Sequence, residues 1–133
     1  MTTLYSGTIT TAGTVISGTV TNLQDKIVNA LGAVFTYGSG GTTAKAFVQT
    51  SFDDGATWQD VTVFSFTTAT ARKGATLGWP TLGTAHFAVT DGALADNTMS
   101  GAPIGNMVRT KLISTGTYAG TTTLVVSADV KRL

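Results

Sequence analysis

The sequence predicts an all-β fold, a single-domain antiparallel β-sandwich or jelly roll. Threonine makes up about a fifth of the 133 residues, and its β-branched side chain favours strands. Glutamate, which favours helices, is absent, and charged residues make up only 11% of the chain. Turn residues recur between short β-prone runs, so we expect roughly seven to nine short strands. A chain of this length predicts one domain, residues 1–133, with a core that needs no disulfide or metal.

The N-terminal part is rich in Thr, Gly and Ser. Residues 1–21 are expected to form two short strands on either side of a turn at Ala12-Gly13. Residues 1–5 are expected to form a flexible N-terminal arm that orders on a neighbouring subunit, or an ordinary frayed terminus.

Residues 22–32 carry leucine and isoleucine at a spacing of four. This spacing fits one or two helical turns, but the run is short and contains poor helix formers, so a loop or a strand fits equally well. Residues 33–37 then predict a buried strand, and residues 38–41 predict a flexible glycine-rich loop.

The stretch Ser51-Phe52-Asp53-Asp54-Gly55-Ala56-Thr57-Trp58 lies between two apolar, β-prone runs, residues 44–50 and 58–66. It therefore predicts the turn of a β-hairpin. Asp53 can accept hydrogen bonds from backbone N–H groups two or three residues on, and Gly55 can take a positive φ without steric cost. Trp58 is expected to anchor the returning strand in the core.

The spacing Ser-x-Asp-x-Gly-x-Thr-Trp resembles the Asp-box, a hairpin motif of sialidases, other β-propellers and assorted β-sandwich proteins. The resemblance implies a structural turn, distant from any catalytic site, made by Ser51, Asp53, Gly55, Thr57 and Trp58. Propellers of the sialidase type carry several copies of the motif. This chain carries one copy and is too short for a propeller.

The third quarter of the chain has weaker patterns. Residues 82–90, which include the only histidine, His86, predict a strand that ends at an Asp91-Gly92 turn. Residues 93–106 have little periodicity and several turn residues. We expect them to form a long surface loop that contacts a partner.

The C-terminal part predicts the clearest pair of strands. Val108, Thr110 and Leu112 alternate with Arg109 and Lys111, so one face of the expected strand is apolar and the opposite face is charged. Residues 122–130 alternate in the same way, and the glycine-containing run 114–120 is expected to connect the two strands.

Residues that could carry chemistry are few. The chain has no cysteine and one histidine, so we expect no zinc or transition-metal site. It has no nucleophile elbow of the Gly-x-Ser-x-Gly type, and we expect His86 to occupy a sheet or an interface. We therefore expect no enzyme activity, no catalytic residue and no cofactor. A weak Ca²⁺ or glycan site near Asp53, Asp54 or Trp79, with Asp60 as a further oxygen ligand, remains an alternative.

Charge and hydropathy bear on the class of partner. The net charge is +1 and the pI is near 8.1, which is too mild to predict nucleic-acid binding. No run approaches the roughly 20 apolar residues of a membrane helix, so we expect no membrane partner. A mean hydropathy of +0.24 with so few charges favours a surface that is partly buried in an assembly.

Two stretches resemble small virion structural proteins of tailed bacteriophages: residues 47–69, which contain the hairpin, and residues 114–124 with the sequence Ser-Thr-Gly-Thr-Tyr-Ala-Gly-Thr-Thr-Thr-Leu. The resemblance implies a head decoration (cement) protein that forms a homo-oligomer, with a trimer favoured, and binds the major capsid protein. It implies a location on the capsid surface of the virion, after synthesis in the host cytoplasm. A tail or head–tail adaptor component and a carbohydrate-binding module are the alternatives.

The partner contacts are expected on the long loop, on the N-terminal arm and on the basic strand. The candidate contact residues are Trp79, Met99, Ile104, Met107, Arg109 and Lys111.

Overall fold

The computed structural model describes residues 1–77 and 86–132, and within these residues it contains strands and no helix. The strands are β1 (Thr2–Thr8), β2 (Gly13–Ile16), β3 (Lys26–Thr36), β4 (Ser39–Gly40), β5 (Thr43–Ser51), β6 (Gln59–Phe66), β7 (Ala71–Thr76), β8 (Met107–Thr115), β9 (Tyr118–Ala119) and β10 (Thr123–Arg132). The all-β prediction is confirmed.

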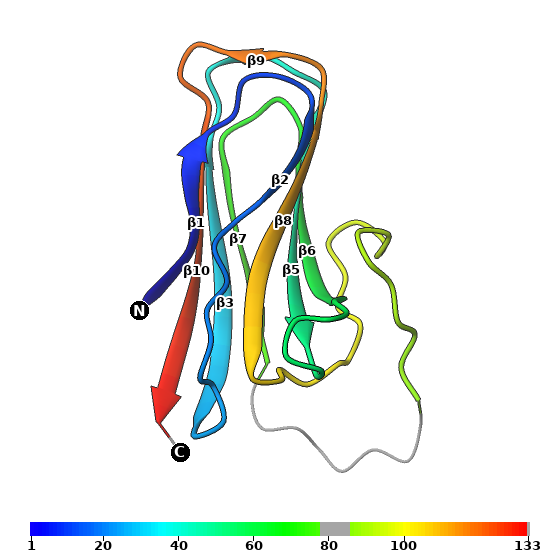
Figure 1. Cartoon of the computed structure of the whole chain (residues 1–133). Helices are drawn as coiled ribbons and strands as arrows, with labels where there is room; N and C mark the ends of the chain where they lie inside the picture. Colours follow the sequence, from blue (N-terminus) through cyan, green and yellow to red (C-terminus); the bar gives the residue numbers. More distant parts are fainter. Residues whose placement is uncertain (78–85, 133) are drawn as a thin grey trace.

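The eight longer strands form two four-stranded sheets that pack face to face (Figure 1). One sheet has the order β1-β10-β3-β7 and the other has the order β2-β8-β5-β6. In each sheet the neighbouring strands are antiparallel. Numbered along the chain, the eight strands pair first with last, second with seventh, third with sixth and fourth with fifth. This is the pairing of a hairpin rolled into two Greek keys, which defines a jelly roll.

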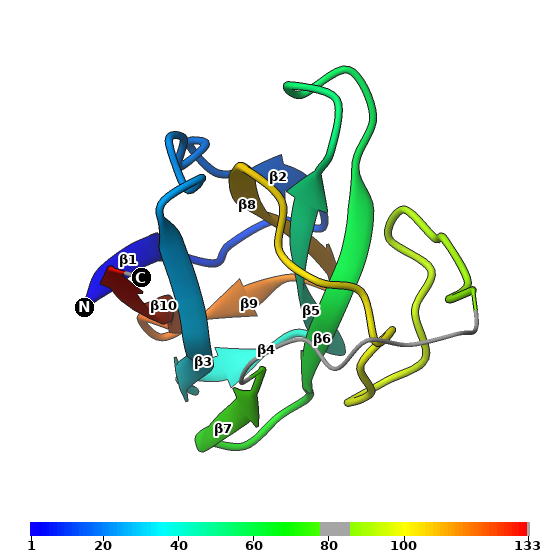
Figure 2. The ribbon, with the colours of Figure 1, turned by 90° about the horizontal axis from the view of Figure 1, so that it is seen from below.

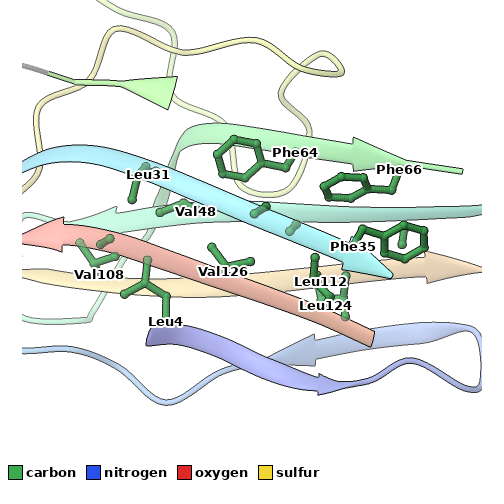
Figure 3. Packing of buried hydrophobic residues seen from close by; sticks show 14 of the residues in the cluster. Leu4, Leu31, Phe35, Val48, Phe64, Phe66, Val108, Leu112, Leu124 and Val126 are labelled. Carbon is green, nitrogen blue, oxygen red and sulfur yellow. The ribbon is translucent and has the colours of Figure 1, made fainter. Parts of the chain in front are cut away.

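The core lies between the two sheets and draws side chains from both (Figure 3). From the first sheet it takes Leu4, Leu31, Ala33, Phe35, Leu124, Val126 and Ala128. From the second it takes Ala44, Ala46, Val48, Phe64, Phe66, Val108 and Leu112. Because successive residues of a strand point to opposite faces, one face of each strand can fill this layer while the other meets solvent.

The predicted alternation of the last two long strands is confirmed. Val108, Thr110 and Leu112 of β8 are buried, while Arg109 and Lys111 are partly exposed on the outer face. In β10, Leu124, Val126 and Ala128 are buried in the same way. The predicted β5–β6 hairpin is also confirmed, since the two strands pair from Ala44 with Phe66 to Thr50 with Gln59.

The expected flexible arm at residues 1–5 is wrong in this structure. These residues belong largely to β1, which pairs with β10 from Thr2 onward and buries Leu4 in the core. The two strands expected in residues 1–21 both form, but they enter different sheets, because the chain crosses from one sheet to the other at residues 9–12.

The possible helical turns in residues 22–32 are replaced by a strand. β3 begins at Lys26, and a β-bulge at Asn29 inserts one extra residue between the partners of Asp129 and Val130. The bulge shifts the phase of the alternation, so Val28 and Leu31, three residues apart, both face the core. The spacing of four does not mark one face, because Leu23 precedes β3 and Ile27 is only partly buried.

The glycine-rich run 38–41 is also more ordered than expected. Ser39 and Gly40 form β4, which pairs with β9 and closes one end of the sandwich (Figure 1). A Cβ atom at Gly38 would overlap the Gly120 carbonyl group. Glycine is therefore needed here for close backbone approach rather than for flexibility.

Around residues 71–90 the sequence patterns miss one strand and predict another that does not form. Strand β7 was not anticipated, although it completes the first sheet by pairing with β3. The expected strand at residues 82–90 lies partly outside the described residues. Its described part, residues 86–90, is not a strand, and His86 is exposed there rather than placed in a sheet.

Candidate functional site

The Asp-box-like turn at the β5–β6 connection is built around two oxygen-bearing side chains. The Ser51 Oγ accepts the backbone N–H of Gly55 at 2.8 Å and donates to the Asp53 carboxylate at 2.8 Å. Asp53 in turn accepts the Thr57 N–H at 2.8 Å and the Thr57 hydroxyl at 2.6 Å. Asp53 thus caps the residue four positions on, and Ser51 takes the N–H that was expected to go to Asp53.

These donors lower the pKa of the Asp53 carboxyl group. The hydrogen bond from the Thr57 hydroxyl, followed by the bonds from the Thr57 backbone and from Ser51, lowers the pKa of Asp53 to about 2. Each donor stabilises the ionised carboxylate over the protonated one. At neutral pH, Asp53 is therefore a fixed anion within the turn.

Trp58 closes the turn but does not enter the core, so that expectation is wrong. Its indole N–H donates to the Gly55 carbonyl at 3.2 Å, and the side chain is half-buried. The guanidinium of Arg109 lies 4.2 Å from its ring centroid, a cation–π arrangement. Arg109 covers one face of the ring, which leaves that face closed to a sugar.

Arg109 begins a polar chain across the outer face of the second sheet. Its Nε donates to the side-chain carbonyl of Gln49 at 2.9 Å. The Gln49 amide then donates to Asp60 at 2.9 Å and to Asp91 at 2.6 Å. Lys111 completes the chain by an ion pair with Asp91 at 3.0 Å. The Gln49 amide, with Lys111, holds the pKa of Asp91 below its ordinary value.

Asp60 is the buried member of this series of polar contacts, and its relative exposure is 1%. Five groups donate to its carboxylate: the backbone N–H groups of Gly92, Ala93 and Leu94, the Thr90 hydroxyl and the Gln49 amide. Consecutive N–H groups of a turn form a concave anion-binding site. Here a carboxylate from the sheet occupies that site, so the turn at residues 90–94 is held against β6.

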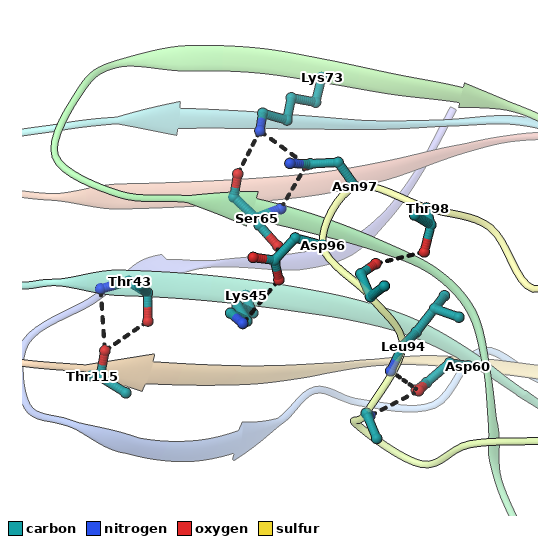
Figure 4. A network of polar contacts seen from close by, with 12 residues as sticks. Thr43, Lys45, Asp60, Ser65, Lys73, Leu94, Asp96, Asn97, Thr98 and Thr115 are labelled. Atoms are coloured by element: carbon teal, nitrogen blue, oxygen red, sulfur yellow. Dashed lines mark hydrogen bonds and ion pairs between the residues drawn. The ribbon is translucent and has the colours of Figure 1, made fainter.

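The loop then continues beside β6, which is the edge strand of the second sheet (Figure 4). The Ser100 N–H donates to the Val61 carbonyl at 2.9 Å, and the Val63 N–H donates to the Thr98 carbonyl at 3.3 Å. Met99 forms an isolated β-bridge with Thr62. Residues 97–100, called the edge strap below, therefore cover most of an edge strand that would otherwise be open.

Lys73 connects the edge strap to the other sheet. Its ammonium group donates to the Ser65 carbonyl and to the Asn97 side-chain oxygen, and it lies 5.2 Å from the Phe66 ring centroid. Beside it, a half-open groove of about 600 Å³ runs between β6 and β7. Apart from Lys73, the residues that line it are uncharged.

The structure brings some of the candidate contact residues together. Met107, Arg109 and Lys111 lie in one row on β8. Met99 is 42% exposed on the edge strap, whereas Ile104 packs against the core and offers less surface. Trp79 lies outside the described residues.

The alternative Ca²⁺ site is not assembled. Asp53 caps its own turn, Asp54 accepts a hydrogen bond from Asn106, and Asp60 is enclosed by the 90–94 turn. Within residues 1–77 and 86–132, no three carboxylate or histidine groups come together as a metal site would require.

Sequence reasoning missed the pairing of Asp60 with the 90–94 turn. The Asp91-Gly92 signal predicts a turn, and Asp60 is a charged residue within an otherwise apolar, β-prone run. Neither pattern says that the two lie side by side, because the contact joins residues about thirty positions apart.

Comparisons with protein-family models, with curated proteins and with solved structures found no match. In the part of the chain that the structure describes, no helix is long and apolar enough to cross a membrane.

Proposed function

We propose that the chain is a non-enzymatic structural protein of a virion, a decoration (cement) protein that binds the major capsid protein as a homo-oligomer, with a trimer favoured. It would lie on the capsid surface after synthesis in the host cytoplasm. Its role would be to add contact area that stabilises the shell. Many modest contacts repeated by symmetry add up to a large effect.

The observation that carries the proposal is the anchored loop at residues 86–106. Asp60 holds one part of this loop and β6 holds the next, yet Val89 and Met99 remain 66% and 42% exposed. A surface of exposed apolar side chains on an ordered loop loses little conformational entropy when it binds a partner. Such a loop suits adhesion better than a reaction.

The jelly-roll strand order supports the virion class by analogy, because viral capsid proteins often use this fold. Lectins also use it, so a carbohydrate-binding module is the second candidate. Trp58, half-buried with Arg109 over its ring, would not be its sugar-stacking platform.

Co-sedimentation tests the proposal. The chain is mixed with empty shells of the major capsid protein encoded in the same genome, and bound copies are counted per shell. We expect hundreds of copies per shell, whereas six or twelve copies would indicate a head–tail adaptor. A variant with Val89→Asp and Met99→Asp should bind at least about tenfold more weakly, because two charges would be placed in the contact.

Val34→Asp is the matched control, since Val34 is 43% exposed on the outer face of the other sheet. It should bind shells as the unmodified chain does. Failure of the unmodified chain to bind shells, together with specific binding on a glycan array, would replace the proposal with the carbohydrate-binding alternative.

A further inference from the structure

The four edge strands of the two sheets differ in how they are protected from pairing with another strand. The edge strap pairs with β6, and β7 carries Arg72 and Lys73. Covering an edge and placing charges on it are two ways in which proteins prevent unwanted strand pairing. Within residues 1–77 and 86–132, no segment covers the other two edges, β1 and β2, and neither strand carries a charge. No charged side chain occurs before Asp25, so both strands are uncharged throughout.

The outer edge of β2 offers unpaired backbone groups. The Ser17 N–H donates to the Thr110 carbonyl at 2.9 Å, which sets the phase of the β2–β8 ladder. Because hydrogen-bonded and non-bonded pairs alternate in an antiparallel ladder, the N–H and C=O groups of Thr14 and Ile16 point away from β8. Among the described residues, no strand pairs with this edge. Val15 and Ile16 are each 50% exposed beside it.

β1 and β2 lie at the same side of the sandwich, opposite β6 and β7, and they run in opposite directions (Figures 1 and 2). A rotation axis parallel to the strands preserves strand direction. An axis of this kind that lies beside the β1 and β2 side of the sandwich therefore brings β2 of one copy beside β1 of the next copy in antiparallel orientation. This holds for a twofold axis and for a threefold axis alike.

We propose that the β2 edge pairs with the β1 edge of a second copy of this chain, so that sheets from two copies join. The pairing satisfies the free groups of Thr14 and Ile16, removes Val15 and Ile16 from water, and brings no like charges together. It specifies the self-association contact of the proposed function. It is tested on the isolated chain, so its failure and a failure to bind shells are separate results.

The first experiment measures mass in solution by sedimentation equilibrium. We expect the unmodified chain to form an oligomer and a Thr14→Pro, Ile16→Lys variant to sediment at the monomer mass of 13.6 kDa. Proline is tolerated on an edge strand where its nitrogen faces outward, so the variant should keep its far-ultraviolet circular dichroism spectrum. Val34→Lys is the matched control, and it should remain oligomeric.

Hydrogen exchange on the unmodified chain gives a reading that does not depend on any variant. The amides of Thr14 and Ile16 should exchange at least about tenfold more slowly at high protein concentration than at low concentration. A chain that is monomeric at all concentrations, or equal exchange of these amides throughout, would overturn the proposal.

Disulfide trapping identifies the partner strand, and the absence of native cysteine makes it simple. A chain with Ile16→Cys is mixed in turn with chains carrying Thr3→Cys, Ser6→Cys or Thr8→Cys. At least one mixture should form a crosslinked heterodimer, because paired strands bring Cα atoms within disulfide range. Efficient crosslinking of Ile16→Cys only with itself would show β2–β2 pairing and contradict the proposed contact.

Discussion

Two aspartates on one hairpin show how far the surroundings of a side chain determine what it does. Asp53 is exposed and caps a turn with local donors from its own hairpin. Asp60 is buried and accepts donors from residues about thirty positions away. The first stabilises a local structure, and the second attaches a long loop to a sheet.

The acidity of Asp53 should depend on the Thr57 hydroxyl, which makes the largest contribution to lowering its pKa. A carboxyl titration by nuclear magnetic resonance should give a pKa of about 2, and Thr57→Val should raise it toward the ordinary value of about 3.9. Thr68→Val, an exposed change in another turn, should leave it unchanged. An unshifted Asp53 in the unmodified chain would contradict the hydrogen-bonded turn.

The same shift makes a statement about stability and pH. Because the folded-state pKa of Asp53 is depressed, its contribution is fully present above the unfolded-state pKa of about 3.9. It is lost as the pH falls toward about 2. The difference in thermal midpoint between the unmodified chain and Asp53→Ala should therefore be constant from pH 7 to 5 and shrink below pH 4. A difference that stays constant down to pH 2 would disprove the assignment.

Asp60→Asn tests the buried anchor. An amide group would set an N–H₂ against backbone donors that now meet a carboxylate oxygen, so we expect a loss of about 2–4 kcal/mol in unfolding free energy. The amides of residues 92–94 should also exchange faster with solvent. Asp54→Asn on the same hairpin is the control, since its exposed side chain should matter by less than about 0.5 kcal/mol.

At the scale of elements, the small β4–β9 sheet closes one end of the sandwich. Tyr118 of β9 is buried, packs edge-on against Phe35 at 5.9 Å between ring centroids, and donates its hydroxyl to the Thr67 carbonyl. The closure works because glycine at position 38 lets two backbones touch. A segment that looks like a flexible linker is thus a packed cap.

Gly38→Ala should therefore be costly. The new methyl group would overlap the Gly120 carbonyl and force the cap apart, so we expect a loss of at least about 2 kcal/mol by denaturant unfolding. Gly18→Ala is the matched control, because a Cβ there meets nothing within 4 Å. It should be neutral or slightly stabilising. Equal effects of the two changes would argue against the tight approach at Gly38.

At the scale of the whole molecule, the two sheets share one core and should unfold together. Phe35 is fully buried in the first sheet and stacks on Phe66 of the second at 4.9 Å between ring centroids. Phe35→Ala should lower the unfolding free energy by about 3–5 kcal/mol, as measured by denaturant unfolding.

The shared core also predicts a single unfolding transition. In a Trp79→Phe background, the fluorescence of Trp58 and the far-ultraviolet circular dichroism, to which both sheets contribute, should show one coincident transition. Two separate transitions would mean that the sheets fold independently.

The fold class was predictable because it depends on composition and on a period of two, both of which are local. The sequence predicts β8 and β10 correctly for that reason. It also predicts the β5–β6 hairpin correctly, because the turn and its two strands are contiguous in the chain. β3 was ambiguous because its bulge at Asn29 interrupts the period. β7 was missed because its six residues, Ala71–Thr76, combine charges and small side chains and show no apolar face of their own.

The candidate site depended more on long-range contacts. The Ser51–Asp53–Thr57 turn could be read from eight consecutive residues. The covering of Trp58 by Arg109 and the capture of the 90–94 turn by Asp60 could not, because each joins strands or loops that only the sheet order brings together.

The sequence by itself determined that this protein is built from strands, where its hairpin turns, and which faces of its last two long strands are apolar. These properties follow from the preferences of individual residues and their nearest neighbours along the chain. Only the tertiary structure decided the jelly-roll order, the anchored loop and the two unprotected edges at β1 and β2. Those features arise from pairing between distant segments, and pairing energy depends on which strands meet rather than on what each strand prefers alone.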